Sequence, residues 1–145
     1  MKVKECMTRN VHVASPKQSI CEAAKMMAEC DAGSLPVGEN DKLVGMITDR
    51  DIALRAVARN LPPTTPVREV MSKEVLYTFD DLDIQEVARN MAQQKVRRLP
   101  VVNRDKRLVG IISIGDLAQG ADEKTLGHAI GDISRPGGLH DQVTH

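Results

Sequence analysis

The feature that most constrains the fold of this chain is an internal repeat. At an offset of 64 residues, which becomes 65 after one inserted residue, 19 of the 50 positions from Val3 to Ile52 match an identical residue further along the chain. Chance would give roughly three identities over such a length, so the chain contains a duplication. Because a copy of about 50 residues buries only a modest core, we expect the two copies to pack against each other around a pseudo-two-fold axis.

Both copies predict the same order of secondary structure. A short strand precedes a helix whose apolar residues recur at i, i+3, i+4 and i+7, and each helix begins with a possible capping box. Two strands joined by a polar turn follow, and a second helix begins directly after them. The pattern predicts an α/β fold built from two β-α-β-β-α repeats. The predicted elements are strands at 10–14, 34–37 and 43–47 with helices from Ser19 and Thr48 in the first copy, and strands at 75–79, 98–102 and 108–112 with helices from Asp83 and Ser113 in the second.

Proline residues predict where the first repeat ends. Residues 60–66 contain three prolines, which prevent a helix from continuing, so this segment is predicted to link a first repeat at 1–59 to a second repeat at 67–120. Beyond the second repeat, residues 121–145 form a C-terminal extension. We expect a short helix over 124–130 in this extension, a break in the structure at 134–138 and mobile chain over 139–145.

Composition and charge exclude several classes of protein. Lys and Arg together number 20, as do Asp and Glu, so the formal net charge is zero, which disfavours a general nucleic-acid binder. No apolar run approaches the roughly 18 residues of a membrane span, and the first residues lack the apolar segment of a secretion signal. The three cysteines form no Cys-x-x-Cys pair and the histidines show no ligand spacing, so we predict no metal site and a reducing, cytoplasmic location.

Three short motifs occur in the same order in both copies. They are Met followed by Thr or Ser, then Leu-Pro-Val, then Gly-x-x-Ser/Thr-x-x-Asp. The first copy has Met7-Thr8, Leu35-Pro36-Val37 and the segment 45–51, and the second copy has Met71-Ser72, Leu99-Pro100-Val101 and the segment 110–116. In these motifs the chain resembles, from Val3 to about Gly120, a tandem pair of cystathionine β-synthase (CBS) domains, also called a Bateman module. It looks like a short stand-alone bacterial CBS-pair protein.

The resemblance implies a non-enzymatic regulatory module for signal transduction or energy sensing. Such modules bind adenine nucleotides (AMP, ADP or ATP), NAD or S-adenosylmethionine in the clefts between their two repeats. The nucleotide is then a regulatory ligand, and no cofactor is required. The resemblance further implies a homodimer whose state is read by a protein partner. Nothing in the sequence suggests a nucleophile paired with a base, so no enzyme activity is expected.

The resemblance also implies which residues hold the nucleotide. The Ser/Thr and Asp of the last motif hold the ribose, and these are Thr48 with Asp51 and Ser113 with Asp116. A carboxylate can accept hydrogen bonds from two vicinal ribose hydroxyls, and a hydroxyl at a helix N-terminus lies beside free N–H groups. The base is expected to lie against the first strand and the start of the middle strand, with one residue of the last strand packing on the base or ribose. The positions are His12, Val13, Ala32, Gly33 and Met46 in the first copy and Leu76, Tyr77, Val96 and Ile111 in the second.

The two copies differ at the position where nucleotide-sensing relatives in this family contact phosphate. Immediately before Leu-Pro-Val, the second copy has Arg97 and Arg98, whose guanidinium groups can donate paired hydrogen bonds to phosphate oxygens. The first copy has Gly33 and Ser34 there. We therefore expect two unequal sites, with the arginines able to serve either cleft.

Other interpretations of these residues are open at this point. Thr48-x-x-Asp51 and Ser113-x-x-Asp116 also have the form of capping boxes, so they can stabilise helices without binding any ligand. Arg97 and Arg98 belong to a local basic cluster that can be a solvated surface or a nucleic-acid patch. The alternatives to nucleotide binding are a ligand-free scaffold that acts through its dimer surface and a weak nucleic-acid-binding regulator.

Overall fold

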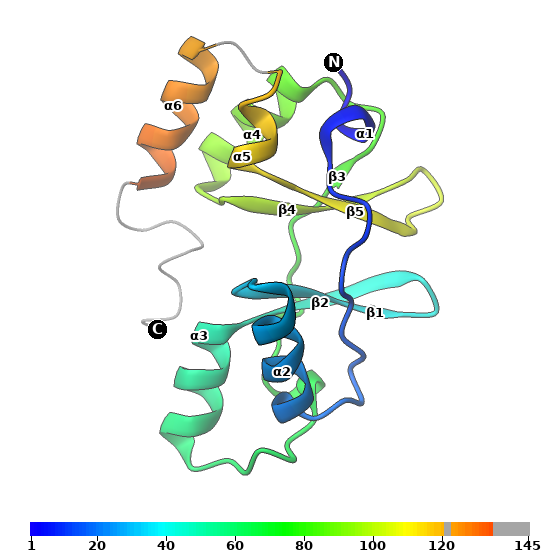
Figure 1. The fold of residues 1–145 in the computed structure, drawn as a ribbon, viewed down its shortest axis with the longest axis vertical. Helices are drawn as coiled ribbons and strands as arrows, with labels where there is room; N and C mark the ends of the chain where they lie inside the picture. Colours follow the sequence, from blue (N-terminus) through cyan, green and yellow to red (C-terminus); the bar gives the residue numbers. More distant parts are fainter. Residues whose placement is uncertain (121–122, 135–145) are drawn as a thin grey trace. The chain divides into compact units, whose positions relative to one another are not determined.

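The structure is a computed structural model that describes residues 1–120 and 123–134 (Figure 1). Its residues group into two compact units. We call them the first-repeat unit, which is His12–Val75, and the second-repeat unit, which combines Met1–Val11 with the chain from Leu76 onward. The first residues of each repeat are thus built into the unit formed by the other repeat.

The first-repeat unit contains an antiparallel pair of strands and three helical segments. The register pairs Ser34 with Thr48 and Leu35 with Ile47, and a bulge lies between Val37 and Gly38. After the second strand the chain forms one continuous helical segment of three types, α, π and 3-10. The elements are α2 (Ile20–Cys30), β1 (Ser34–Glu39), β2 (Lys42–Thr48), α3 (Asp49–Asp51), the π-helix η1 (Ile52–Ala56) and the 3-10 helices η2 (Val57–Arg59) and η3 (Val67–Glu69).

Helix α2 begins where the sequence predicts. The Ser19 hydroxyl accepts a hydrogen bond from the N–H of Glu22 at 3.1 Å, which satisfies one of the free donors of the first turn. The Glu22 carboxylate lies 3.4 Å from the same hydroxyl and does not return to the Ser19 backbone, so the predicted capping box is only half formed. The helix buries Ile20, Ala23 and Met27, as their spacing predicts, whereas Ala24, at position i+4 of the same pattern, is exposed.

The segment that contains η3 completes the core of the first-repeat unit. Val67 and Val70 are fully buried and belong to one apolar cluster with Val37 and other residues of the strands. The backbones of Met46 and Ser72 exchange hydrogen bonds of 3.0 and 2.8 Å, so this segment also pairs with β2. Residues that begin the second repeat in sequence are therefore part of the fold of the first.

The second-repeat unit contains a three-stranded sheet in the order β3-β4-β5. β3 runs parallel to β4, and β4 runs antiparallel to β5 with Arg98 opposite Ser113. The elements are α1 (Val3–Cys6), β3 (Thr78–Phe79), α4 (Ile84–Gln94), β4 (Arg98–Val102), β5 (Leu108–Ser113), α5 (Ile114–Leu117) and α6 (Glu123–Ser134).

Helix α1 and helix α6 both contribute to the core of this unit. Val3 is fully buried among residues of α4 and the sheet, and the backbones of Thr8 and Ile111 exchange hydrogen bonds of 2.8 and 2.9 Å. Helix α6 packs beside α4 and buries Ala129 and Ile133 (Figure 1). No helix within residues 1–120 and 123–134 is long and apolar enough to cross a membrane.

The structure differs from the predicted elements at the first strand of each repeat. Residues 10–14 form no strand, because Ala14 alone pairs there, with Val37. The strand predicted at 75–79 is reduced to the two residues of β3. Asp83 caps α4 by accepting from the N–H of Gln85 at 2.9 Å and does not form the predicted box. The helix expected over 124–130 is present as the longer α6, and the mobile segment expected over 139–145 lies outside the described residues.

Candidate functional site

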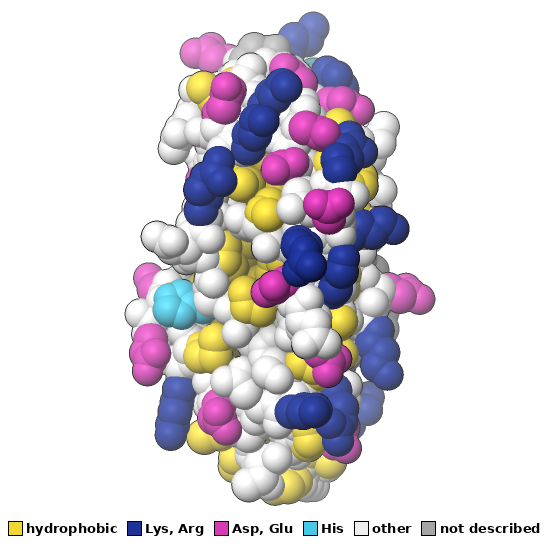
Figure 2. Space-filling model, turned by 90° about the vertical axis from the view of Figure 1, so that its right-hand side faces the viewer, with side chains coloured by type: hydrophobic (Ala, Val, Ile, Leu, Met, Phe, Trp, Pro, Cys, Tyr) yellow, Lys and Arg dark blue, Asp and Glu magenta, His cyan; other side chains and the backbone are white. Residues whose placement is uncertain are grey.

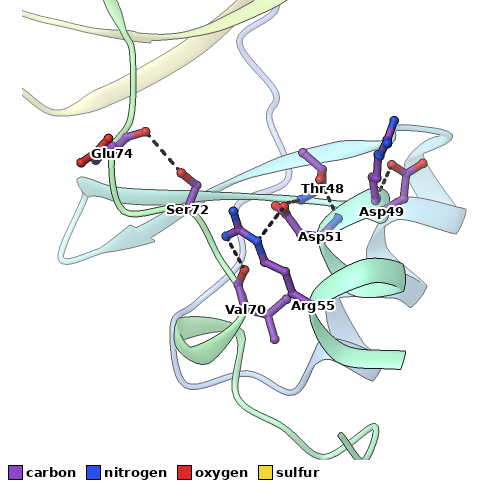
Figure 3. Close-up of polar contacts among 8 residues, drawn as sticks. Thr48, Asp49, Asp51, Arg55, Val70, Ser72 and Glu74 are labelled. Carbon is purple, nitrogen blue, oxygen red and sulfur yellow. Dashed lines mark hydrogen bonds and ion pairs between the residues drawn. The ribbon is translucent and has the colours of Figure 1, made fainter. Parts of the chain in front are cut away.

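The last motif of the first repeat forms a reciprocal capping box. Thr48 ends β2, and its hydroxyl accepts a hydrogen bond from the N–H of Asp51 at 3.0 Å (Figure 3). In turn, Oδ2 of the Asp51 carboxylate accepts a hydrogen bond from the N–H of Thr48 at 3.0 Å. Only 4% of Asp51 is exposed. The two side chains that the sequence predicts in a nucleotide site therefore accept hydrogen bonds from backbone N–H groups at the start of their own helix.

Arg55 compensates the buried charge of Asp51. Its Nε lies 3.8 Å from Asp51 Oδ1, and its Nη1 donates to the carbonyl oxygen of Val70 at 3.4 Å (Figure 3). The side chain of Arg55 remains 40% exposed, so this ion pair is partly screened by water. Sequence reasoning missed Arg55, although its position four residues after Asp51 on a helix is a usable signal.

Asp49 lies beside the start of β1. Its N–H donates to the carbonyl of Gly33 at 2.9 Å, and its Oδ1 accepts from the N–H of Arg50 at 2.8 Å. A Cβ built on Gly33 would lie 3.0 Å from Asp49 Oδ2. The absence of a side chain at Gly33 therefore leaves room for this carboxylate. We call Gly33, Thr48, Asp49, Asp51 and Arg55 the first site.

The second repeat has the same capping geometry. The Ser113 hydroxyl accepts from the N–H of Asp116 at 3.2 Å, and Asp116 Oδ2 accepts from the N–H of Ser113 at 2.9 Å. The N–H of Ile114 donates to the carbonyl of Arg97 at 3.1 Å, just as that of Asp49 does to Gly33. Arg97 and Arg98 are exposed, and Arg98 pairs with Ser113 in the sheet. We call Arg97, Arg98, Ser113 and Asp116 the second site.

The surroundings of Asp116 differ from those of Asp51. Gly120 stands where the first repeat has Arg55, and within residues 1–120 and 123–134 no Lys or Arg forms an ion pair with Asp116. The Asp116 carboxylate is half-buried, and its negative charge affects the pKa of a nearby thiol. Burial raises the pKa of the Cys6 thiol, and the negative charges of Asp116 and Glu5 raise it further.

In the first-repeat unit, the residues expected to contact the base lie on different parts of the backbone. His12 and Val13 are exposed and precede the bridge from Ala14 to Val37. The N–H of Ala32 donates a hydrogen bond to the carbonyl of Met27 at 3.0 Å, and the backbone of Met46 exchanges hydrogen bonds with that of Ser72. Among the predicted residues of this copy, the hydrogen bonds of the described chain directly connect only Thr48 and Asp51. Gly33 is joined to this pair indirectly, because its carbonyl accepts from the N–H of Asp49, which follows Thr48.

In the second-repeat unit, the predicted base residues fall into two environments. Leu76 is half-buried, and Tyr77 is 42% exposed with its ring edge-on to Phe79 at 5.7 Å between centroids. Val96 is buried in the apolar core and its N–H donates to Met91. The backbone of Ile111 pairs with Thr8.

The basic cluster around Arg97 is not a uniform positive surface. Arg104 donates two hydrogen bonds of 2.8 Å to the Asp81 carboxylate and lies over the Phe79 ring at 4.1 Å. The hydrogen bond from Arg104 lowers the pKa of Asp81. On the face drawn in Figure 2, Lys and Arg side chains alternate with Asp and Glu side chains and form no single patch. The described residues also contain no group of three or more His, Cys, Asp or Glu that could hold a metal ion.

Two solved structures similar to this chain contain adenosyl ligands. CBSX2 of Arabidopsis thaliana, solved in complex with AMP, is 31% identical, covers 83% of this chain and 95% of its own, and superposes with a TM-score of 0.72. The CBS domain pair of protein MJ0100, solved with 5′-methylthioadenosine and S-adenosyl-L-methionine, is 32% identical with a TM-score of 0.71, over 82% of this chain and 94% of its own.

Sequence comparison gives the same result over both repeats. The CBS domain-containing protein YhcV of Bacillus subtilis is 43% identical over 133 residues, which are 91% of this chain and 94% of YhcV. The family model of the CBS domain matches twice, at residues 3–57 and 67–122. The chain belongs to the CBS domain family and contains a pair of CBS repeats.

Proposed function

We propose that this protein is a non-catalytic regulatory module that binds an adenine nucleotide, and that the second site is its phosphate-binding half. The observation that carries the proposal is the pairing of Arg98 with Ser113 and of the Arg97 carbonyl with the N–H of Ile114. Two exposed cationic residues therefore lie at the same end of the β4–β5 strand pair as the motif hydroxyl and carboxylate. The AMP and S-adenosylmethionine in similar CBS pairs support this class of ligand.

The second site has chemistry suited to both ends of a nucleoside phosphate. Asp116 uses Oδ2 to cap its own helix, and no hydrogen bond from the described residues reaches Oδ1. That oxygen is available to accept from ribose hydroxyls. Arg97 and Arg98 can donate charge-assisted hydrogen bonds to phosphate oxygens, which are about twice as strong as neutral ones. The remaining residues expected around the base, from Leu76 to Ile111 in this copy, stay predictions.

Regulation would follow from linkage between ligand binding and the conformational state of the protein. A ligand shifts an equilibrium between two states only by its differential affinity for them. A protein partner that prefers one state would then read the nucleotide level. AMP, ADP, ATP and NAD are the candidate ligands, and energy sensing is the corresponding role.

Calorimetry and thermal unfolding test the proposal together. Melting temperature should rise with the concentration of AMP, ATP or NAD according to mass action, and native mass spectrometry of freshly purified protein should show any retained nucleotide.

Asp116→Ala should remove this rise in melting temperature. Arg98→Gln should weaken AMP binding about tenfold, because a charge-assisted hydrogen bond is lost. Arg104→Gln is the matched control, since Arg104 is held by Asp81 and should not affect affinity. A chain with no response to any of these nucleotides contradicts the proposal.

A ligand-free scaffold is the second candidate, favoured by the capping boxes. Both motif carboxylates already accept a backbone N–H, as helix caps do without any ligand. In this case Asp51→Ala and Asp116→Ala would each cost about 1 kcal/mol of stability and leave ligand titrations flat. The two candidates are therefore separated by the same variants.

We also propose a homodimer formed through the helical segment after Asp51. Val57 is 67% exposed, and Leu54 and Leu61 are also large exposed apolar residues. Ala56 of the same segment is fully buried in its own unit and is not available to a partner. Light scattering of Val57→Glu should show a loss of dimer, whereas Ile130→Glu, an exposed apolar position on α6, should leave the assembly unchanged.

A further inference from the structure

Thr78 differs from the other buried polar side chains that the structure describes. It is 3% exposed, yet its Oγ1 has no hydrogen-bond partner among the described residues. A hydroxyl buried without a partner costs free energy, because the hydrogen bonds that it makes to water in the unfolded chain are lost. The matching residue of the first repeat, Ala14, is also buried and pairs with Val37 as Thr78 pairs with Val101, but it has no hydroxyl. The cost is therefore specific to the second repeat.

The strand that contains Thr78 is short and lies at a sheet edge. Strand β3 consists of Thr78 and Phe79, is the first strand in the order β3-β4-β5, and follows residues 75–77, which have no regular secondary structure. Just after the strand, the chain is held by the N-terminal segment, because the N–H of Lys4 donates to the carbonyl of Asp80 at 2.9 Å. A short edge strand with a costly buried group belongs to the parts of a fold that open most readily.

An exposed cluster of side chains connects β3 to the turn between β4 and β5. Arg104, in this turn, donates two hydrogen bonds of 2.8 Å to Asp81 and lies 4.1 Å from the centre of the Phe79 ring. Such contacts of a guanidinium group with a carboxylate and an aromatic ring are attractive. We call Phe79, Asp81 and Arg104 the clamp. The first repeat lacks these groups, since its matching residues are Ser15, Lys17 and Asn40.

The buried hydroxyl and the clamp act on the same strand in opposite directions. We infer that β3 is a detachable strand, which separates from β4 while the rest of the second-repeat unit stays folded, and that the clamp sets how often it separates. In the open form the Thr78 hydroxyl reaches water, and the edge of β4 at Val101 and Val102 becomes available for pairing. Because 59% of the Arg104 side chain is exposed, ionic strength should control the population of this form. The inference concerns one unit and does not depend on nucleotide binding.

Hydrogen exchange of the full native chain, followed by NMR for individual amides, tests the local opening. The reporter is the N–H of Asp80, which donates to the carbonyl of Val102 at 3.1 Å and is freed when β3 leaves β4. The reference is the N–H of Met91, inside helix α4, whose side chain is fully buried. In urea below the unfolding transition, exchange at Asp80 should stay constant, because local opening exposes little surface, whereas exchange at Met91 should accelerate. Equal acceleration at both amides overturns the inference.

Two threonine variants test the buried hydroxyl. Thr78→Val keeps a similar shape and removes the hydroxyl, so it should slow exchange at Asp80 about tenfold. Thr65→Val is the matched control, because Thr65 is 5% exposed but its Oγ1 donates to the carbonyl of Pro62 at 2.6 Å. This control should lower the stability of the chain to urea, since it leaves a carbonyl without its donor.

Arg104→Gln tests the clamp. It should accelerate exchange at Asp80 about threefold, and raising sodium chloride from about 0.05 M to about 1 M should have the same effect on the wild type but little effect on the variant. The open form stays a small minority in either case, so Arg104→Gln still serves as a control for nucleotide affinity.

The remaining outcomes are decisive for the inference and leave the proposed function standing. Unchanged exchange at Asp80 in Thr78→Val would mean that the hydroxyl has a partner, such as a buried water molecule, and would overturn the inference. Exchange at Asp80 that responds neither to Arg104→Gln nor to salt would show that the clamp does not hold β3, which overturns it as well.

Discussion

The two motif carboxylates, Asp51 and Asp116, have the same hydrogen bonds but different neighbours. Each accepts the N–H of the motif Thr or Ser, at 3.0 and 2.9 Å. Asp51 is buried beside Arg55, whereas Asp116 is half-buried, has Gly120 in the place of that arginine, and acts on the thiol of Cys6. Duplication has therefore preserved the backbone geometry of the motif and changed the charges around it. The comparison shows that the charges around a motif can diverge between two copies that keep the same hydrogen bonds.

The largest effect is expected at the glycine that precedes each motif hydroxyl by three residues. A Cβ on Gly110 would lie 2.6 Å from the carbonyl oxygen of Thr8, and one on Gly45 would lie 2.6 Å from the flexible end of Met71 and 2.9 Å from the carbonyl of Ser72. We expect Gly110→Ala and Gly45→Ala to cost about 1–3 kcal/mol in urea unfolding, with Gly110 the more costly because backbone must move. Gly127→Ala, with nothing within 4 Å, is the control and should not destabilise. Equal stability of all three variants would contradict the close approach.

Removal of the motif hydroxyls tests whether the two caps are equivalent. Thr48→Ala and Ser113→Ala should each lower the free energy of unfolding by about 1 kcal/mol, because the N–H of Asp51 or Asp116 loses its acceptor. The loss should be greater at Thr48, where the cap surrounds a buried carboxylate. Ser72→Ala removes an exposed hydroxyl with a long 3.4 Å hydrogen bond and should be nearly neutral. A larger loss at Ser113 would contradict the expectation that the cap around the more buried carboxylate contributes more.

The ion pair between Arg55 and Asp51, which has no counterpart at Asp116 among the described residues, should have a smaller effect that depends on salt. Arg55→Gln is expected to cost less than about 1 kcal/mol, since the Arg55 side chain is 40% exposed and screened by water. The loss should shrink between 0.05 and 1 M salt, roughly as the Debye length falls below the ion-pair distance. Arg50→Gln, an exposed arginine nearby, provides the baseline. A loss that does not change with salt would mean that Arg55 acts by packing and not by charge.

The smallest effect is expected from exchanging Cys6 for the residue at the matching position, Val70. The folded-state pKa of Cys6 lies above its ordinary value of 9.0, so the folded state resists ionisation that the unfolded state permits. The stabilising contribution is fully present below the unfolded-state pKa of 9.0 and is lost as the pH rises from there through the higher folded-state pKa. Wild-type stability should therefore fall more steeply than that of Cys6→Val between about pH 8.5 and 10. Parallel curves would show that the thiol does not contribute.

The sequence predicted the elements whose signals are local. The spacing of Ile20, Ala23 and Met27 identified α2, and the paired motifs identified β1, β2, β4 and β5. Residues 10–14 were wrongly assigned to a strand, because apolar Val11 and Val13 suggest alternation but only Ala14 finds a partner. The pairing of residues 1–11 with the second repeat depends on long-range contacts such as Thr8 with Ile111, which no local pattern encodes.

The candidate sites were only partly predictable for the same reason. Thr48, Asp51, Ser113 and Asp116 follow from the motif, and their reciprocal hydrogen bonds match the capping form that the sequence allows. Asp49 was missed because its proximity to Gly33 depends on the strand register, which the motif does not contain. Their roles in ligand binding stay predictions until the titrations above are made.

The exchanged segments have a consequence for how such a protein can be divided. Val67 and Val70 fill the interior of the first-repeat unit, and Val3 and Met7 fill that of the second. A product cut at the proline-rich connection would leave one half without its buried valines and the other without its leading helix. Each copy carries its own motif, yet neither copy contains by itself all the buried residues of a folded unit.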